Sequence, residues 1–395
     1  MRVGIDVTSC LNPRGYGRFA RGLVSALLSR SGTHQFVLLS DSQTAGRVDL
    51  PTGAAEWVVV PTRRASVDAA SHGGRRSLGE LWAMAAAVAR QRHDVQFFPT
   101  VYTFFPVISS ARLVVGFHDV IPEEFPELVF PERRGRRLWN LKTRLARFQA
   151  DLIMTVSEHS KRGIQRQFGW PADKVWVVDE APDPVFRRLA PGEIDDRLLA
   201  AHGLDRDGRL LVYVGGINPH KNLGAVLGAL ARLRRRPELA DLTLVIVGET
   251  SEERFTPGLS ELRERIATLS LEDCVRFTGY LPDEQVVHLL NRAQALVLPS
   301  MAEGYGLPAV EAAACGTPVV ATRNSPLPDL LAGGGLFVDP HDPEDLRAAL
   351  ERLLGDDELR RELGETARQR TTVLSWDRSA AQMLELLAAM ERPRP

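Results

Sequence analysis

The chain has 395 residues, 44% of them hydrophobic and 25% charged, which is typical of a globular protein and long enough to predict two domains. Residues 1–190 carry 26 Lys and Arg against 18 Asp and Glu, whereas residues 191–395 carry 23 against 32, so the first half favours an anionic partner or surface. The three cysteines (Cys10, Cys274 and Cys315) are far apart in sequence, which favours buried thiols over disulfides or a zinc site.

Short β-branched runs alternate with helix-length amphipathic segments along the chain. We expect strands at residues 2–7, 35–40, 56–61, 94–99, 112–119, 151–157 and 175–180, and again at 210–216, 242–248, 274–279, 295–300, 317–322 and 335–340. Helix-length segments include residues 17–30, 222–238 and 343–356. Apolar strands separated by helices predict parallel sheets that are covered on both faces.

A strandless stretch rich in Pro and charge, residues 181–204, is the best candidate for a linker. The expected fold class is therefore α/β, with two Rossmann-like, doubly wound parallel-sheet domains that face each other across a cleft. We place the first domain at residues 1–188 and the second at 189–375. A C-terminal helix over 376–395 could cross back to the first domain.

The first strand leads into the turn "VTSCLNPRGYGRFARGL", in which Gly15 and Gly17 precede Arg18 and Arg21. Ligands of such folds lie at the carboxyl ends of strands, so this position favours contact with a phosphate or a substrate. A purely structural turn is the alternative.

The segment "GFHDVIPEEFPE" follows a later strand of the first half. His118 and Asp119 end that strand, and Pro122 and Pro126 are expected to keep the chain after it out of a helix. A histidine in such a loop can transfer a proton or bind a hydroxyl. The alternative is a structural histidine whose hydrogen bonds are satisfied within the protein.

A strongly basic helix is expected near residues 133–147, where seven basic residues fall within 15 positions. The apolar residues Leu138, Leu141, Leu145 and Phe148 recur at helical spacing. Such a helix can rest weakly on an anionic membrane that holds a lipid-linked acceptor. The favoured interpretation, however, is a helix whose apolar stripe packs into the core while its arginines are solvated.

The turn "VYVGGINPHKNLGAVL" again joins a strand to a helix. Gly215 and Gly216 open the backbone, and Asn222 is expected to cap the helix. Lys221 is one of only four lysines among 49 basic residues, which favours a required point charge that grips a phosphate. A solvated lysine is the alternative.

Two glutamates, Glu303 and Glu311, flank the glycine-rich turn in "PSMAEGYGLPAVEAAACGTPVVAT". Pro308 suits the first turn of the helix, and Gly316 suits its end. The free N–H groups at the start of this helix favour an anion, and the two carboxylates then suit hydroxyl groups, so together they describe a sugar nucleotide. The alternative is a solvated loop acid and an ordinary surface residue, although the apolar setting of Glu311 argues for burial.

Other site classes lack their sequence patterns. No Asp-x-Asp pair follows a strand, no His or Cys cluster has metal-ligand spacing, and neither a P-loop nor a G-x-S-x-G elbow occurs. We therefore expect no metal, no cofactor and no nucleic-acid partner. No apolar run has the length of a signal peptide or of a spanning helix, so we expect a cytoplasmic protein, peripheral at most to the inner face of a membrane.

Taken together, these residues resemble the retaining glycosyltransferases of family GT4, which have the GT-B fold. The resemblance covers nearly the whole chain and includes the H-D-x-I-P loop, "TVSEHSK", the "YVGG-x4-KN" turn, "GYLPDEQV" and "SW" at Ser375 and Trp376. Its most specific element is the E-x7-E motif from Glu303 to Glu311. The general pattern is closest to GDP-mannose-type enzymes of surface-polysaccharide assembly, and glycosylation of secondary metabolites is equally compatible.

The resemblance implies a role for each matching residue. Glu311 would hold the ribose hydroxyls, and Glu303 would lie beside the donor sugar and steady the transition state. The amides of Gly304, Tyr305, Gly306 and Leu307 would face the sugar and the pyrophosphate, and Lys221 would bind the pyrophosphate. His118 would lie near the sugar and the acceptor. Gly15 and Gly17 would face a phosphate, and the Leu281 backbone would lie beside the base. Many members have an arginine where this chain has Gly216, so phosphate charge would rest on Lys221, backbone amides and Arg18 or His220.

The resemblance also implies a reaction, in which a sugar moves from a nucleotide-sugar to a hydroxyl of a glycan, a lipid-linked or a small-molecule acceptor, with retention and without metal. The alternatives are a sugar-nucleotide epimerase, a phosphorylase and a non-catalytic binder of sugar nucleotides. A phosphorylase would need a cofactor-binding lysine, and lysines are scarce here. Gly216 is the best support for the binder, and the intact glutamate pair is the best argument against it.

Overall fold

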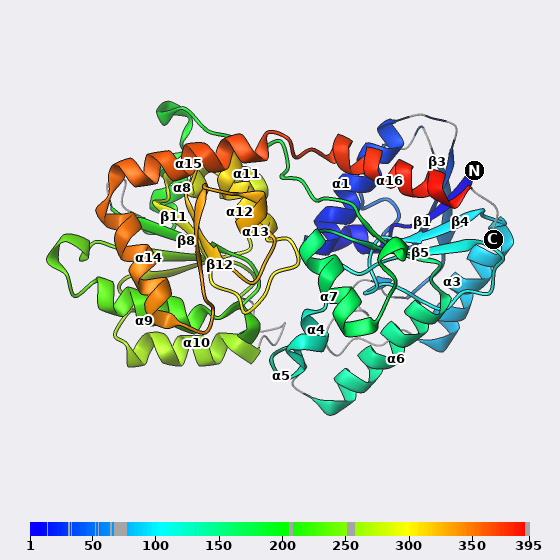
Figure 1. Ribbon diagram of the computed structural model, residues 1–395, viewed down its shortest axis with the longest axis horizontal. Coiled ribbons are helices and arrows are strands. Elements are labelled where there is room, and N and C mark those ends of the chain that lie inside the picture. The colour runs from blue at the N-terminus through cyan, green and yellow to red at the C-terminus, as the bar shows by residue number, and fades with distance from the viewer. Residues whose placement is uncertain are drawn as a thin grey trace. The chain divides into compact units, whose positions relative to one another are not determined.

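The computed structural model of the protein describes residues 1–13, 15–30, 32, 34–51, 53, 55–63, 65–66, 77–130, 132–204, 208–250 and 257–391. The chain divides into two compact units, each built on one parallel β-sheet (Figure 1). The first unit comprises Met1–Pro126, Phe130–Ala181 and Ser375–Pro395, and the second comprises Glu127–Val129 and Pro182–Leu374. The last four residues of the helix expected over 376–395 lie outside the described residues.

The described sheet of the first unit has seven parallel strands in the order β3-β2-β1-β4-β5-β6-β7. They are β1 (Arg2–Asp6), β2 (Gln35–Asp41), β3 (Ala55–Val60), β4 (Val95–Phe98), β5 (Arg112–Gly116), β6 (Leu152–Thr155) and β7 (Val175–Val177). The longer helices are α1 (Gly15–Ser29), α3 (Leu78–Gln91), α6 (Arg133–Gln149), α7 (Glu158–Phe168) and α16 (Trp376–Met390). All four residues of the central strand β4 are buried, as expected for a parallel sheet that is covered on both faces.

The C-terminal helix α16 packs against α1 within the first unit (Figure 1). Gly22 of α1 allows this approach, since a Cβ there would lie 2.3 Å from the Trp376 ring. Ser379 Oγ donates to the Asp179 carbonyl at 2.6 Å, and Gln382 Nε2 donates to the Asp179 carboxylate at 2.8 Å. These contacts join the end of the chain to the segment that follows β7.

The described sheet of the second unit has six parallel strands in the order β10-β9-β8-β11-β12-β13. They are β8 (Leu210–Val214), β9 (Thr243–Val247), β10 (Val275–Gly279), β11 (Ala295–Leu298), β12 (Val319–Thr322) and β13 (Gly335–Val338). The helices are α8 (Asp196–Ala201), α9 (Leu223–Leu233), α10 (Pro257–Thr268), α11 (Asp283–Arg292), α12 (Leu307–Ala314), α13 (Leu327–Leu330), α14 (Pro343–Gly355) and α15 (Asp357–Thr371). The order reverses between β8 and β11, and ligands of doubly wound sheets bind at such a switch point.

The predicted fold class is confirmed, because each run expected as a strand overlaps a strand of one of the two parallel sheets. The three cysteines are buried free thiols, as predicted, and burial raises the pKa of Cys10 to about 12. Across the described ranges, no helix is both long enough and apolar enough to span a bilayer.

The segment after β5 corrects one expectation. Pro122 and Pro126 do not keep the chain out of helix, because each lies in the first turn of a short helix, α4 (Ile121–Glu124) or α5 (Pro126–Val129). Proline is tolerated there because the first N–H groups of a helix have no partner within the helix.

Helix α6 corrects another expectation. Its apolar stripe was expected to pack into the core, yet Leu138 and Leu141 are each 55% exposed and Phe148 is 86% exposed. The residues of α6 that are buried are Thr143 and Ala146. The small residues therefore face the sheet, and the four residues of the apolar stripe face outward.

Candidate functional site

The candidate site of the second unit lies at the carboxyl ends of β8 and β11, on the two sides of the switch point. After β8 the backbone makes a narrow turn in which Gly215 has φ 152°. A Cβ on Gly248, after β9, would lie 2.1 Å from the Gly215 carbonyl oxygen, so the two turns touch through backbone alone. Tyr213 Oη donates to the Gly216 carbonyl at 2.7 Å and so holds the turn in place.

Lys221 and Glu303 meet at this point. Lys221 Nζ lies 2.7 Å from Glu303 Oε1, and their side chains are only 19% and 10% exposed. Ser300 Oγ donates to the same carboxylate oxygen at 2.5 Å. Lys221 is therefore not a solvated lysine, and Glu303 is not a solvated loop acid.

The loops that carry this ion pair are fastened to each other. The Met301 N–H donates to the His220 carbonyl at 2.8 Å, and the Glu303 N–H donates to the Asn324 carbonyl at 3.1 Å. Asn222, which was expected to cap α9 with its side chain, instead donates to the carbonyls of Pro299 and Pro340, at 3.2 and 3.0 Å. Because these bonds fix both backbones, the ion pair is preorganised rather than assembled from mobile side chains.

The glycine-rich turn continues from Glu303 into α12. Gly306 has φ 86°, and a Cβ there would also lie 2.8 Å from the Leu327 side chain, so this position requires glycine. Pro308 lies in the first turn of α12, as predicted. Glu311 is 1% exposed among buried apolar residues of the same helix, so its predicted burial is confirmed. Gly304 and Tyr305, which is 3% exposed, complete the turn.

Leu281 lies beyond the end of β10 and is 8% exposed. The strands are parallel, so their carboxyl ends lie at the same edge of the sheet. The predicted residues of the second unit therefore follow one edge, although β10 is two strands away from β8. Gly216 and Lys221 follow β8, Leu281 follows β10, and the segment from Glu303 onward follows β11. Ligands of doubly wound sheets bind at this edge.

The first unit carries the other predicted residues. Gly17 lies at the start of α1, where a Cβ would come within 2.1 Å of the Asn12 carbonyl oxygen, whereas a Cβ on Gly15 would meet no atom within 4 Å. Arg21 Nη1 donates to the carbonyls of Cys10 and Asn12, at 2.5 and 2.9 Å, and so holds the turn after β1. Of the two glycines, only Gly17 is required by the local packing.

His118 is enclosed by protein groups. Its Nε2 donates to the Pro99 carbonyl at 2.9 Å, and its Nδ1 lies 3.6 Å from Glu180 Oε1. Burial lowers the pKa of His118, but the carboxylate of Glu180 outweighs burial and the net pKa lies above the ordinary value. The ring is held between the end of β4 and the segment after β7. These contacts fit the structural-histidine alternative.

Sequence reasoning missed Glu180, Ser300 and Tyr213. Glu180 is 4% exposed and lies a few residues beyond the end of β7, ahead of "APDP". This position near a strand end was its only signal. Ser300 donates a hydrogen bond to Glu303, and Tyr213 donates one to the Gly216 carbonyl. Both contacts depend on how the strand ends are placed in space.

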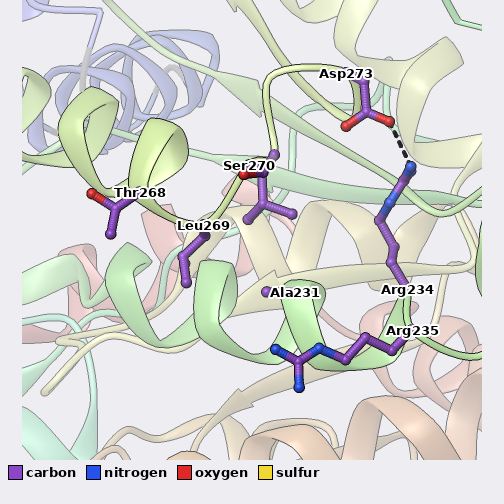
Figure 2. Close-up of a pocket in the computed structure, with 8 residues that line it drawn as sticks. Ala231, Arg234, Arg235, Thr268, Leu269, Ser270 and Asp273 are labelled. Carbon is purple, nitrogen blue, oxygen red and sulfur yellow. Dashed lines mark hydrogen bonds and ion pairs between the residues drawn. The ribbon is translucent and has the colours of Figure 1, made fainter.

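A surface cavity of ≈ 370 Å³ lies elsewhere in the second unit, between the end of α9 and the end of α10 (Figure 2). Arg234 Nη2 closes one side of it through Asp273 Oδ2 at 2.6 Å. Both helices end there and lead into the amino ends of β9 and β10, which is the edge of the sheet opposite to the switch point. In the described part of the chain, no cluster of three or more His, Cys, Asp and Glu side chains could hold a metal ion.

Comparison with known protein families gives two matches that together cover most of the chain. Residues 13–184 match the family described as Glycosyltransferase Family 4, and residues 195–370 match the family described as Glycosyl transferases group 1. Lys221, Glu303 and Glu311 lie in the second match, and His118 lies in the first.

Individual relatives carry names of sugar-transferring enzymes. The chain is 38% identical over 310 residues to D-inositol 3-phosphate glycosyltransferase of Frankia alni (76% of this chain, 70% of the relative). It is 31% identical over 273 residues to O-antigen chain mannosyltransferase B of Escherichia coli (69% of each). The match to D-inositol 3-phosphate glycosyltransferase of Corynebacterium jeikeium is 33% identical but spans only 57% of that protein and 60% of this chain.

Solved structures share the fold over nearly the whole chain. Sucrose-phosphate synthase from Thermosynechococcus elongatus superposes with a TM-score of 0.78 at 18% identity, covering 99% of both chains. HepE from Anabaena, solved in complex with UDP-glucose, superposes with a TM-score of 0.73 at 20% identity, covering 98% of this chain and 100% of HepE.

Proposed function

This chain belongs to glycosyltransferase family 4, and we propose that it is a retaining, metal-independent enzyme that moves a sugar from a nucleotide-sugar to a hydroxyl acceptor. The donor would be of the GDP-mannose or UDP-sugar type. The acceptor would be a glycan, a lipid-linked compound or a secondary metabolite. The observation that carries the proposal is the buried contact of Lys221 with Glu303 at the switch point, beside the helix of Glu311.

The donor would occupy the edge of the second sheet described above. Glu311 would accept hydrogen bonds from the ribose hydroxyls, and Leu281 would border the base through its backbone. Lys221 and the amides of the turn from Gly304 to Leu307 would bind the diphosphate, because amides at a helix start and a lysine both favour anions. Many members of the family place an arginine at the position of Gly216, so in this chain Lys221 would be the main cation on the phosphates.

The ion pair gives each partner a task in the reaction. Before the donor binds, Lys221 is held in place by Glu303, so its position costs little on binding. When the diphosphate takes up the lysine charge, the carboxylate of Glu303 becomes available to the hydroxyls of the donor sugar. Positive charge that develops on the sugar is then stabilised by a carboxylate already in place.

The bond changes would occur on one face of the sugar. The bond from the anomeric carbon to the phosphate oxygen breaks, the bond to the acceptor oxygen forms, and the acceptor proton passes to the departing phosphate. The nucleoside diphosphate leaves with both electrons of the broken bond. The resemblance gives His118 a role beside the acceptor, and its contacts with the Pro99 carbonyl and Glu180 would serve to orient its ring for that role.

Turnover separates this proposal from a binder and from an epimerase. Wild-type protein incubated with GDP-mannose or UDP-glucose and a hydroxyl acceptor panel should release nucleoside diphosphate, and proton NMR should show the product anomer retained. Glu303→Ala should lose this release by about 10²-fold or more. Conversion of the donor sugar without release would identify an epimerase, and the absence of both reactions would leave a binder.

A further inference from the structure

The outer face of α6 presents a continuous apolar surface. Leu138, Leu141, Leu145 and Phe148 lie three or four residues apart on one face, and they are 55%, 55%, 37% and 86% exposed. At the end of the helix, Gln149 exchanges hydrogen bonds with the Val107 backbone, at 3.1 and 2.9 Å. These bonds place Ile108, which is 88% exposed, at the same end of the surface. We call these five residues the α6 surface.

The opposite face of α6 is fastened to the first unit. Trp139 Nε1 donates to Glu123 Oε1 at 2.7 Å, and the Arg147 guanidinium lies over the Phe168 ring, 4.0 Å from its centroid. Ala146 is fully buried against the sheet. The helix therefore cannot rotate to bring its leucines inward without losing these contacts.

The same helix carries a charge that its neighbours do not neutralise. It has seven basic residues and no acidic one. Across the described residues, five of its arginines form no side-chain hydrogen bond or ion pair: Arg133, Arg134, Arg136, Arg137 and Arg144. By contrast, Arg347 of α14 pairs with Glu344, and Arg368 of α15 pairs with Glu365.

The combination of exposed apolar residues and unpaired arginines limits what can cover the α6 surface. A second copy of this chain, docked through the same face, would bring two unneutralised clusters of positive charge together. Water alone would leave five large apolar residues solvated side by side. An anionic lipid bilayer meets both needs, because its headgroups attract arginine and its acyl boundary accepts the apolar side chains.

We propose that the α6 surface docks on an anionic lipid bilayer, with Leu141 and Phe148 entering the headgroup–acyl boundary. In this arrangement the apolar side chains and the arginines both contribute to binding, whereas binding by charge alone would not depend on the apolar side chains. The consequence for the reaction rests on the proposed function: among the acceptor classes it allows, docking of this kind favours a hydroxyl compound carried on a membrane lipid.

The experiment is cosedimentation of the full chain with vesicles of phosphatidylcholine containing 30% phosphatidylglycerol, beside vesicles of phosphatidylcholine alone. The wild type should bind the anionic vesicles at least about tenfold more strongly. Leu141→Ser/Phe148→Ser should weaken that binding by about tenfold or more, and Arg133→Glu/Arg137→Glu should do the same. Neither change touches a buried contact of α6, so both variants should fold.

A matched control comes from α3 of the same unit. Leu78 and Trp82 are 84% and 72% exposed there, but the helix has only Arg90 and Glu80 as charged residues. Leu78→Ser/Trp82→Ser should leave vesicle binding unchanged. The proposal is overturned if the wild type does not bind anionic vesicles, or if Leu141→Ser/Phe148→Ser binds them as the wild type does.

Size-exclusion chromatography tests the rival occupant. A wild-type dimer that Leu141→Ser/Phe148→Ser converts to a monomer would show that a second copy covers the α6 surface, and would overturn the proposal. Vesicle binding requires neither donor nor turnover, so its failure would leave the proposed glycosyl transfer untouched. Conversely, a chain that binds vesicles without turnover would retain this inference and lose the proposed function.

Discussion

Removal of the lysine charge at the switch point should destabilise the second unit. In Lys221→Met, the Glu303 carboxylate keeps the hydrogen bond from Ser300 but loses its cation while only 10% exposed. Loss of one partner from a buried ion pair costs about 3–5 kcal/mol, and the partial exposure of this pair reduces our expectation to about 2–4 kcal/mol. For a unit of this size, that corresponds to a fall of roughly 5–12 °C in the unfolding temperature.

The assay is differential scanning calorimetry of the wild type and three variants. The matched control is Arg209→Met, which breaks a 2.7 Å ion pair with Asp241 in the same unit, where both side chains are about 40% exposed (39% and 43%). An exposed pair of this kind is worth about 0.2–1 kcal/mol. Lys221→Met/Glu303→Gln should recover much of the lost stability, because the unpaired charge is removed. The reasoning is refuted if Lys221→Met costs no more than Arg209→Met.

Two further predictions concern the first unit. Gly17→Ala should destabilise the protein by about 2 kcal/mol or more, because the new Cβ would meet the Asn12 carbonyl, whereas Gly15→Ala should be tolerated. Urea unfolding of both variants measures the difference, and equal unfolding midpoints would contradict the prediction. Glu180→Gln should lower the pKa of His118, because only the Pro99 carbonyl and Asp119 would then oppose the effect of burial. NMR titration of the ring measures this pKa, and an unchanged value would contradict the assignment. Since the folded pKa of His118 is raised, its contribution to stability should be complete below pH 6.5 and lost as pH rises through the raised pKa, a loss absent from Glu180→Gln.

The sheets and their order of elements were predictable because parallel strands are buried on both faces and appear as continuous apolar runs. The turns of Lys221 and Glu303 were predictable for a related reason: ligands of such sheets bind where strands end. Their contact was not predictable, since the two residues lie 82 positions apart and meet only when β8 and β11 pair.

Helix α6 shows where periodicity is insufficient. An apolar stripe indicates that a helix has two different faces, but it does not state which face meets the sheet. In α6, the small residues Thr143 and Ala146 allow close packing, and Trp139 reaches Glu123, so the stripe of leucines is left outside. Asn222 shows the same limit on a smaller scale, because its amide bonds to Pro299 and Pro340 depend on segments far along the chain.

The measurement that tests the central claim most directly is calorimetric titration of UDP, GDP, ADP and dTDP into the wild type and Glu311→Ala, with EDTA present. One nucleotide should bind the wild type without metal, and Glu311→Ala should weaken that binding by about tenfold or more, because the ribose hydroxyls lose a charged acceptor. The identity of that nucleotide would also fix the donor class. If none of the four binds, or if Glu311→Ala binds as tightly as the wild type, the proposed donor site is contradicted.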